Sequence, residues 1–208
     1  MKTEKKVFHH AEIGDMYYLL QMPEHYEAGK TPFVVFLHGV GERGHNYDLI
    51  SVHGLPKMVL GGRKIPAVVI SPQCPVEYVW HNIPAALKAL IDEVISGLDG
   101  EGAPVSITGI SMGGYGTWEM TMTYPDFFYK AAPICGGGTP WRAHLIHCPV
   151  WAFHGDQDST VPPKNSYEMV DAVNQAGGNA RLTLFHGVGH LCWEEAYEDS
   201  RVIDWLTE

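Results

Sequence analysis

The sequence has 208 residues, a formal net charge of −10 and a hydrophobic content of 45%. This apolar content is sufficient for a folded core, and the acidic balance argues against a nucleic-acid partner, which requires a basic surface. No apolar run approaches the roughly 20 residues of a membrane span, and no apolar signal segment follows the charged residues at positions 2–6. We expect one domain over residues 1–208 with no membrane partner, while the compartment and the oligomeric state stay open.

The predicted elements alternate between strands and helices along the chain. Residues 7–9 and 16–22 predict an antiparallel hairpin at one edge of a sheet. Continuous apolar runs, typical of strands buried on both faces, predict strands at 33–37, 67–71, 104–108, 130–134, 149–154 and 181–186. Helices are expected near 84–97, 112–124, 163–176 and 195–206. This alternation indicates an α/β fold with a mostly parallel sheet, an antiparallel N-terminal edge and helices on both faces.

One strand-to-helix junction carries the sequence Gly109-Ile110-Ser111-Met112-Gly113. A serine between two glycines at such a junction is typical of a nucleophile elbow, a turn so tight that its flanking residues must be small. The turn exposes the serine hydroxyl and points the first amide of the following helix toward whatever the serine attacks. The alternative interpretation is a glycine-rich turn capped by serine.

Polar residues follow three other predicted strands. His38 and Gly39 come after residues 33–37, Asp156 and Asp158 after 149–154, and His190 after 181–186. Open parallel sheets place their sites at these carboxyl ends. Serine, acid and histidine also follow one another in the chain order of the α/β-hydrolase triad.

The chain resembles the α/β-hydrolases, and within them the phospholipase/carboxylesterase and dienelactone-hydrolase group. More narrowly, it resembles the small bacterial serine esterases often catalogued as predicted peptidases. The motifs that carry this resemblance are Leu37–Gly44, Ser71–Pro75, Gly109–Trp118, Pro133–Gly137, Phe153–Asp158 and Gly189–Trp193. Dienelactone hydrolases use a cysteine nucleophile, so a serine at position 111 argues against their chemistry.

The resemblance implies a catalytic triad of Ser111, Asp158 and His190. Two carboxylates compete for the acid position, and the resembling families use the aspartate just before a Val-Pro pair, which is Asp158. Asp156 is then expected to hydrogen-bond the turn. The oxyanion donors would be the backbone amides of Val40 and Met112. His38 is expected to brace this oxyanion loop by hydrogen bonds.

Neither the histidines nor the cysteines predict a metal site or a cofactor. No His-Glu-x-x-His or Cys-x-x-Cys motif occurs among the twelve histidines and four cysteines. Surface and capping roles account for histidines such as His144 and His147. Reduced, partly buried thiols are expected at Cys74, Cys135, Cys148 and Cys192.

Several polar and aromatic residues fall near the ends of predicted strands or in adjacent loops, where they are candidates for substrate binding. They are Gln73, Trp80, His81, Tyr115, Trp141 and Trp193. Core or surface packing is the alternative for the tryptophans, and a turn role is the alternative for Gln73. The chain has no room for a cap domain, so an open cleft for small soluble esters is expected.

Three functions fit this pattern. The first is a serine carboxylesterase that hydrolyses short acyl or aryl esters, including acetyl or hydroxycinnamoyl esters of plant polysaccharide. The second is a serine peptidase of the same fold, and the third is a non-catalytic binding domain, for which a broken triad is expected.

Overall fold

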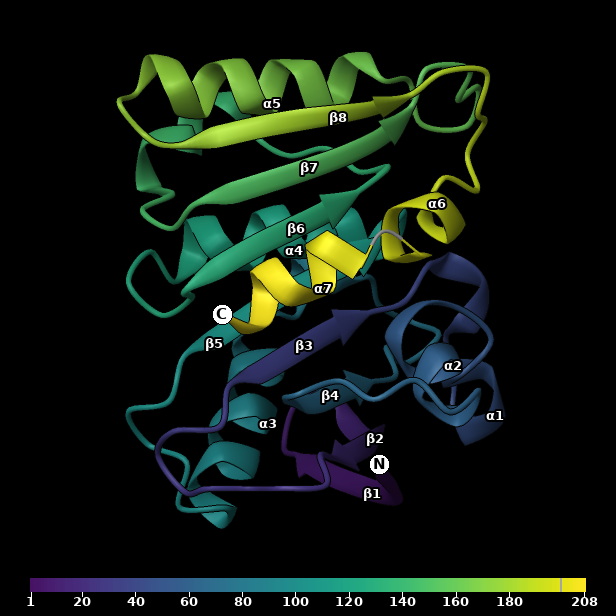
Figure 1. Ribbon diagram of the computed structural model, residues 1–208, viewed down its shortest axis with the longest axis vertical. Coiled ribbons are helices and arrows are strands. Elements are labelled where there is room, and N and C mark those ends of the chain that lie inside the picture. Colours follow the sequence, from purple (N-terminus) through teal and green to yellow (C-terminus); the bar gives the residue numbers. More distant parts are fainter. Residues whose placement is uncertain (199) are drawn as a thin grey trace.

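A computed structural model describes residues 1–198 and 200–208, and within them eight strands form one twisted sheet (Figure 1). Its strand order is β1-β2-β4-β3-β5-β6-β7-β8. The strands β1 and β2 run antiparallel to their neighbours, and the other strand pairs are parallel. Their bounds are β1 Lys2–His10, β2 Gly14–Met22, β3 Phe33–Leu37, β4 Val68–Pro72, β5 Val105–Ile110, β6 Lys130–Ile134, β7 Val150–Gly155 and β8 Ala180–Phe185.

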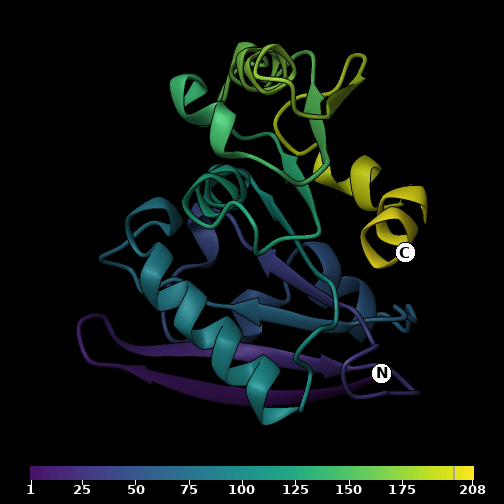
Figure 2. The same ribbon diagram turned by 90° about the vertical axis from the view of Figure 1, so that its left-hand side faces the viewer.

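The helices lie in two layers on opposite faces of the sheet, as Figure 2 shows. Side chains of α3, α4 and α5 pack with one set of strand residues, and side chains of α2, α6 and α7 pack with the alternate set. The helices are α1 Tyr47–Ile50, α2 Gly54–Leu60, α3 Pro84–Gly97, α4 Met112–Thr123, α5 Lys164–Gln175, α6 Trp193–Glu198 and α7 Ser200–Thr207. The predicted fold class is therefore confirmed.

Alternating residues of β3 show why this strand is apolar throughout. Val35 packs in the core under α3 and α4, whereas Val34 and Phe36 pack in the core under α2, α6 and α7. Successive strand side chains point to opposite faces, so a central strand between two helical layers needs apolar residues at every position.

The structure differs from the sequence prediction at both ends of the chain. The first strand begins at Lys2 rather than at residue 7, because it pairs with β2 over its whole length. The helix predicted over 195–206 corresponds to α6, which begins at Trp193, and to α7; position 199 lies outside the described residues.

Parallel pairing brings the carboxyl ends of β3, β5, β7 and β8 to the same side of the molecule, on the right of Figure 1. The loops that leave these four strands contain the residues with candidate catalytic roles. Among the described residues, no helix is long and apolar enough to span a membrane.

Candidate active site

Ser111 occupies a sharp turn between β5 and α4. Its φ of 53° lies in the left-handed region that non-glycine residues rarely adopt, and its backbone N–H donates to Ile134 O at 3.0 Å. A Cβ added to Gly109 would lie 2.4 Å from Gly113 O, and one added to Gly113 would lie 1.9 Å from Leu37 O. Both glycines are therefore needed for the close approach of β3, β5 and α4. This is the geometry expected of a nucleophile elbow.

Ser111, His190 and Asp158 form a continuous hydrogen-bonded chain. The Ser111 hydroxyl lies 2.8 Å from His190 Nε2, and His190 Nδ1 lies 2.7 Å from Asp158 Oδ2. With the imidazole neutral, Nδ1–H donates to the carboxylate, and Nε2 is left to accept the serine proton. The Asp158 side chain is fully buried and that of His190 is 19% exposed, so the histidine is open to a substrate from one side.

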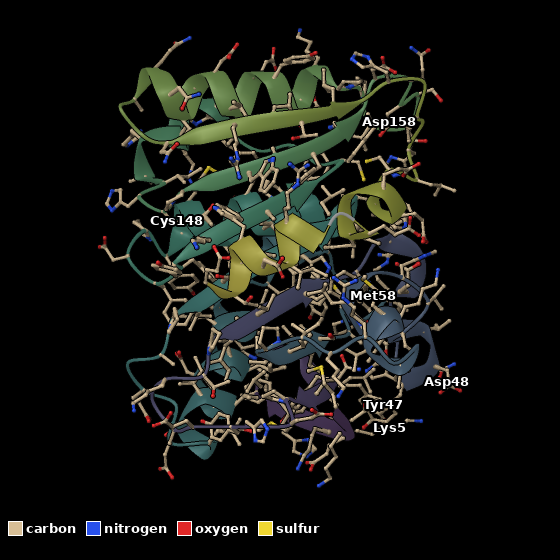
Figure 3. All side chains as sticks on the ribbon, in the orientation of Figure 1. Lys5, Tyr47, Asp48, Met58, Cys148 and Asp158 are labelled. Atoms are coloured by element: carbon tan, nitrogen blue, oxygen red, sulfur yellow. The ribbon has the colours of Figure 1, made fainter. Side chains whose placement is uncertain are left out.

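Asp158 lies where the chain leaves β7 (Figure 3), and backbone donors fix its carboxylate. The N–H groups of Thr160 and Val161 donate to Oδ1 at 2.8 and 2.9 Å. Burial raises the pKa of Asp158, but the hydrogen bonds from His190, Val161 and Thr160 outweigh burial and hold that pKa below its ordinary value. The carboxylate therefore stays charged in the folded protein at neutral pH.

A second histidine, His154 at the end of β7, also contacts this carboxylate. Its Nε2 lies 3.2 Å from Asp158 Oδ2 and 2.9 Å from Val161 O. Both of these atoms are acceptors, so Nε2 must carry a proton. Nδ1 then accepts the hydroxyl proton of Ser166 at 2.7 Å. Burial lowers the pKa of His154, which favours this neutral tautomer over the imidazolium.

Sequence reasoning assigned no role to His154. The signal that could have identified it is its position four residues before Asp158, at the carboxyl end of a buried strand. Its side chain is completely buried. A buried imidazole that donates to a carboxylate helps to set the orientation of that carboxylate.

Asp156, the competing carboxylate, lies near the triad but holds a different turn. Its Oδ1 accepts the N–H of Gly187 at 2.8 Å, and its Oδ2 lies 3.0 Å from His186 Nδ1. The hydrogen bond from His186 is the main cause that lowers the pKa of Asp156. The structure thus gives Asp156 the turn contacts that were predicted, at the start of the loop to His190.

Val40 and Met112, the predicted oxyanion donors, are each the first residue of a helix. Val40 begins the 3-10 helix Val40–Glu42 next to Gly39, and Met112 begins α4. First-turn N–H groups have no partner within their own helix, so they are available to an anionic ligand. A Cβ placed on Gly39 would lie 3.8 Å from Ser111 Cβ, so this loop runs directly beside the serine. The role of the two amides in oxyanion binding stays a prediction.

His38 braces the oxyanion loop, as expected. Its Nδ1–H donates to Gly39 O at 2.6 Å, its Nε2 accepts the N–H of Cys74 at 3.0 Å, and its carbonyl accepts the indole N–H of Trp80 at 2.9 Å. Burial lowers the pKa of His38 to about 4. The imidazole is therefore neutral at physiological pH and serves as a fixed donor and acceptor.

Two further side chains hold the same loop in place: Gln73, which directly follows β4, and Arg43, which belongs to the loop. The Gln73 amide donates to Glu42 O at 2.7 Å and accepts the N–H of Asn46 at 2.8 Å. Arg43 donates to Val40 O at 3.1 Å and to Val76 O at 3.0 Å. Gln73 is fully buried, so the structure supports its alternative role in a turn and not the expected contact with substrate.

The cleft at Ser111 has a volume of about 170 Å³. Its lining residues come from the oxyanion loop, the elbow, His53 and the loop after β8; they are Gly39, Val40, Gly41, Glu42, His53, Ile110, Ser111, His190, Leu191 and Trp193. Of the six candidate substrate residues, the structure brings only Trp193 to this cleft. Sequence reasoning gave no role to Glu42, His53 or Leu191, although Glu42 and Leu191 lie within the motifs Leu37–Gly44 and Gly189–Trp193.

The other candidate residues lie elsewhere. Trp80 is fully buried because its indole packs on His38 and bonds to the His38 carbonyl, so its predicted contact with substrate is wrong. Tyr115 is half-buried and accepts a hydrogen bond from Asn165 at 2.9 Å. Trp141 is 80% exposed on the 3-10 helix Pro140–Leu145, and His81 is exposed on the 3-10 helix Trp80–Asn82.

Among the described residues, one group could offer three metal ligands. The ligand atoms of Cys135, Asp158 and His190 lie within 4.8 Å of one another. However, His190 and Asp158 already use these atoms in hydrogen bonds, and burial raises the pKa of the Cys135 thiol well above its ordinary value. A cysteine binds a metal as the thiolate, which the raised pKa disfavours. The three residues therefore fit a hydrogen-bonded network better than a metal site. All four cysteines are buried and free.

Comparisons with known proteins show which families this chain is similar to. The sequence model of the prolyl oligopeptidase family matches residues 139–208, which include Asp158 and His190. A poly(3-hydroxyalkanoate) depolymerase C of Paucimonas lemoignei is 25% identical over 81% of this chain, which spans about half (49%) of that protein.

Solved structures extend the likeness to nearly the whole chain. A thermostable esterase is 31% identical, with a TM-score of 0.85 over 98% of this chain and 62% of its own. The feruloyl esterase module from Clostridium thermocellum has the same fold at 18% identity, with a TM-score of 0.73 over 99% of this chain and 87% of its own. The chain therefore has the fold of the α/β-hydrolases, and it is similar to esterases of that fold.

Proposed function

We propose that this chain is a serine carboxylesterase that hydrolyses short-chain acyl or aryl esters through an acyl-enzyme. The observation that carries the proposal is the hydrogen-bonded chain from Ser111 through His190 to Asp158, at 2.8 and 2.7 Å. A serine becomes nucleophilic only when a base takes its proton, and a neutral imidazole held by a carboxylate is such a base.

In the proposed reaction, Ser111 Oγ attacks the ester carbonyl while His190 Nε2 takes the serine proton. The buried carboxylate of Asp158 stabilises the imidazolium that forms. The negative charge on the carbonyl oxygen is met by the N–H groups of Val40 and Met112. His190 then protonates the leaving alcohol, and a water molecule, activated by the same histidine, releases the acid from Ser111.

The solved structures support ester substrates of this kind. One similar structure is an esterase, and another is a feruloyl esterase module complexed with sinapinate. We therefore include hydroxycinnamoyl and acetyl esters of plant polysaccharide among the candidate substrates. Within this set, the small cleft at Ser111 favours the acetyl group over the larger hydroxycinnamoyl group.

A serine peptidase is the second candidate, and the match to the prolyl oligopeptidase family over residues 139–208 favours it. The same triad can cleave amides, but an amide nitrogen leaves only when it is protonated and well positioned. Peptide p-nitroanilides tested beside p-nitrophenyl esters separate the two activities.

The decisive experiment measures hydrolysis of p-nitrophenyl acetate and butyrate by the wild-type chain and by Ser111→Ala. We expect the variant to lose about 10⁴–10⁶-fold in kcat with an unchanged circular dichroism spectrum. A serine-directed phosphonate should label Ser111 alone. Substantial activity in a folded Ser111→Ala protein would overturn the proposal.

A further inference from the structure

A pocket lies between α2 and α6, next to the cleft at Ser111. It has a volume of about 490 Å³, and its lining residues are Gly54, Lys57, Met58, Gly61, Arg63, Trp193, Glu194, Tyr197 and Glu198. We propose that this α2–α6 pocket binds the alcohol half of the substrate, an aryl group that carries a carboxylate. The inference rests on the proposed esterase function.

Trp193 lines both the α2–α6 pocket and the catalytic cleft, so the two cavities lie next to each other. Its ring lies edge-on to that of His190, with ring centres 5.6 Å apart, and to that of His53, with centres 5.3 Å apart. His190 is the group that protonates the leaving oxygen, so the alcohol half of the ester must leave Ser111 on the histidine side. This is the side on which Trp193 and the α2–α6 pocket lie.

The sizes of the two cavities support a division of the substrate between them. Pockets for small molecules usually measure about 300–1,000 Å³. The cleft at Ser111, at about 170 Å³, is smaller than this and leaves space for the acyl group alone. The α2–α6 pocket lies within the range and has room for an aromatic ring.

The walls of the α2–α6 pocket suit a flat apolar group. Met58 on α2 lies toward α6 (Figure 3), and the α6 wall is formed by the largely buried residues Trp193 and Tyr197. Gly54 and Gly61 add backbone without side chains. Flat rings pack well on aromatic and thioether side chains, which contribute large apolar contact areas.

One cation at this pocket is available for an anionic substituent. Lys57 is paired with Glu194 across the pocket, at 3.1 Å. Arg63 is half-buried, and within the part of the chain that the structure describes its side chain has no ion pair or hydrogen bond. Glu198 lines the same pocket without pairing with Arg63. A guanidinium binds a carboxylate through two parallel hydrogen bonds, so a benzoate is the matching ligand.

The test compares two acetate esters that differ only in a carboxylate, phenyl acetate and 3-acetoxybenzoate. The variant Arg63→Gln should lose about fivefold to tenfold in kcat/KM for 3-acetoxybenzoate and stay within about twofold for phenyl acetate. The matched control is Lys64→Gln, which removes the neighbouring positive charge. Lys64 pairs with Glu24 at 2.8 Å and lies outside the α2–α6 pocket, so the control should change neither value.

A second variant tests the pocket itself. Met58→Trp should fill it and raise KM for both aryl acetates, while methyl acetate, which has no aryl group, should keep its KM. Equal effects of Arg63→Gln on the two aryl esters, or unchanged KM values in a folded Met58→Trp protein, would contradict the proposal.

Direct binding separates this inference from the proposed function. Titration calorimetry of wild-type protein with 3-hydroxybenzoate, the product of the test ester, should show binding that Arg63→Gln weakens and Lys64→Gln retains. If no ester is hydrolysed but 3-hydroxybenzoate binds in this way, the proposed function is wrong and the assignment of the pocket as a carboxylate-binding site is still supported. If esters are hydrolysed without this pattern, the pocket assignment is wrong.

Discussion

His154 Nε2 lies 3.2 Å from Asp158 Oδ2, the same carboxylate oxygen that accepts the hydrogen bond from His190. Two imidazoles thus face one oxygen, and two backbone N–H groups hold the other. The acid is fixed from four directions before any substrate arrives. Such preorganisation keeps the proposed base in a single orientation during the reaction.

The first prediction concerns His154 as a positioning residue. His154→Ala removes a donor to the carboxylate, so we expect kcat for p-nitrophenyl acetate to fall about tenfold with KM unchanged. The free energy of unfolding should also fall, by about 1.5–3 kcal/mol for a lost hydrogen bond to a charged group. Steady-state kinetics and urea unfolding measure the two effects. Retention of full kcat in a destabilised variant would show that His154 acts on stability alone.

The second prediction ranks the two carboxylates. Asp158→Asn should lower kcat by about 10⁴-fold, because an amide at this position favours the wrong tautomer of His190. Asp156→Asn should keep most of the activity and lower the melting temperature, since its contacts are with the turn at His186 and Gly187. Kinetics and thermal unfolding of both variants check the ranking. A larger kinetic defect in Asp156→Asn would reverse the assignment of the acid.

The third prediction is a pH dependence of stability that originates in His38. Burial lowers the pKa of His38 to about 4 from an unfolded value near 6.5, so the unfolded chain binds the proton more tightly than the folded protein. Stability is therefore full above about pH 6.5 and decreases as the pH falls toward about 4, by about 3 kcal/mol for this group. His154, whose pKa burial also lowers, acts in the same direction.

Urea unfolding at several pH values between about 7 and 4 measures this slope. The variant His38→Gln offers a donor and an acceptor without a titrating ring, so its stability should vary less with pH over this window. An identical slope in the variant would mean that His38 is not the group responsible.

The fourth prediction is a preference for short acyl chains. Each CH₂ group of the acyl chain adds about 0.8 kcal/mol of binding free energy only if the cleft is large enough to bury it. The cleft at Ser111 measures about 170 Å³. We expect kcat/KM for p-nitrophenyl esters to be highest between about C2 and C6 and to fall beyond that length. A maximum at C12 or longer, or a rate increase at the solubility limit of the ester, would contradict this expectation.

The sequence was informative wherever local chemistry dictates structure. The strand at residues 33–37 is apolar at every position because both faces are covered, and its bounds match β3. The glycines around Ser111 revealed the elbow because only glycine fits there. These signals depend on neighbours in the chain or on a known tight turn.

Sequence reasoning failed where the role of a side chain depends on which other segment of the chain packs against it. Trp80 comes after a strand that ends near the candidate site, which suggested a role there. Its indole N–H instead donates to the buried carbonyl of His38, 42 positions away. The contact of His154 with Asp158 depends on how the chain curls after β7. The α2–α6 pocket joins segments more than 130 positions apart, which no local pattern indicates.

Helix α7 holds the strand that leads to Ser111, so it affects when the folded site can form during synthesis. The Ser106 hydroxyl on β5 donates to Leu206 O at 2.7 Å, and Lys130 on β6 donates to Trp205 O at 2.7 Å. The strand β5, which leads into the elbow, and its neighbour β6 are thus held by residues that are synthesised about 75–100 positions later. A nascent chain that still lacks residues 200–207 leaves these two strand contacts unmade, so the proposed hydrolytic activity should appear only after α7 has been synthesised.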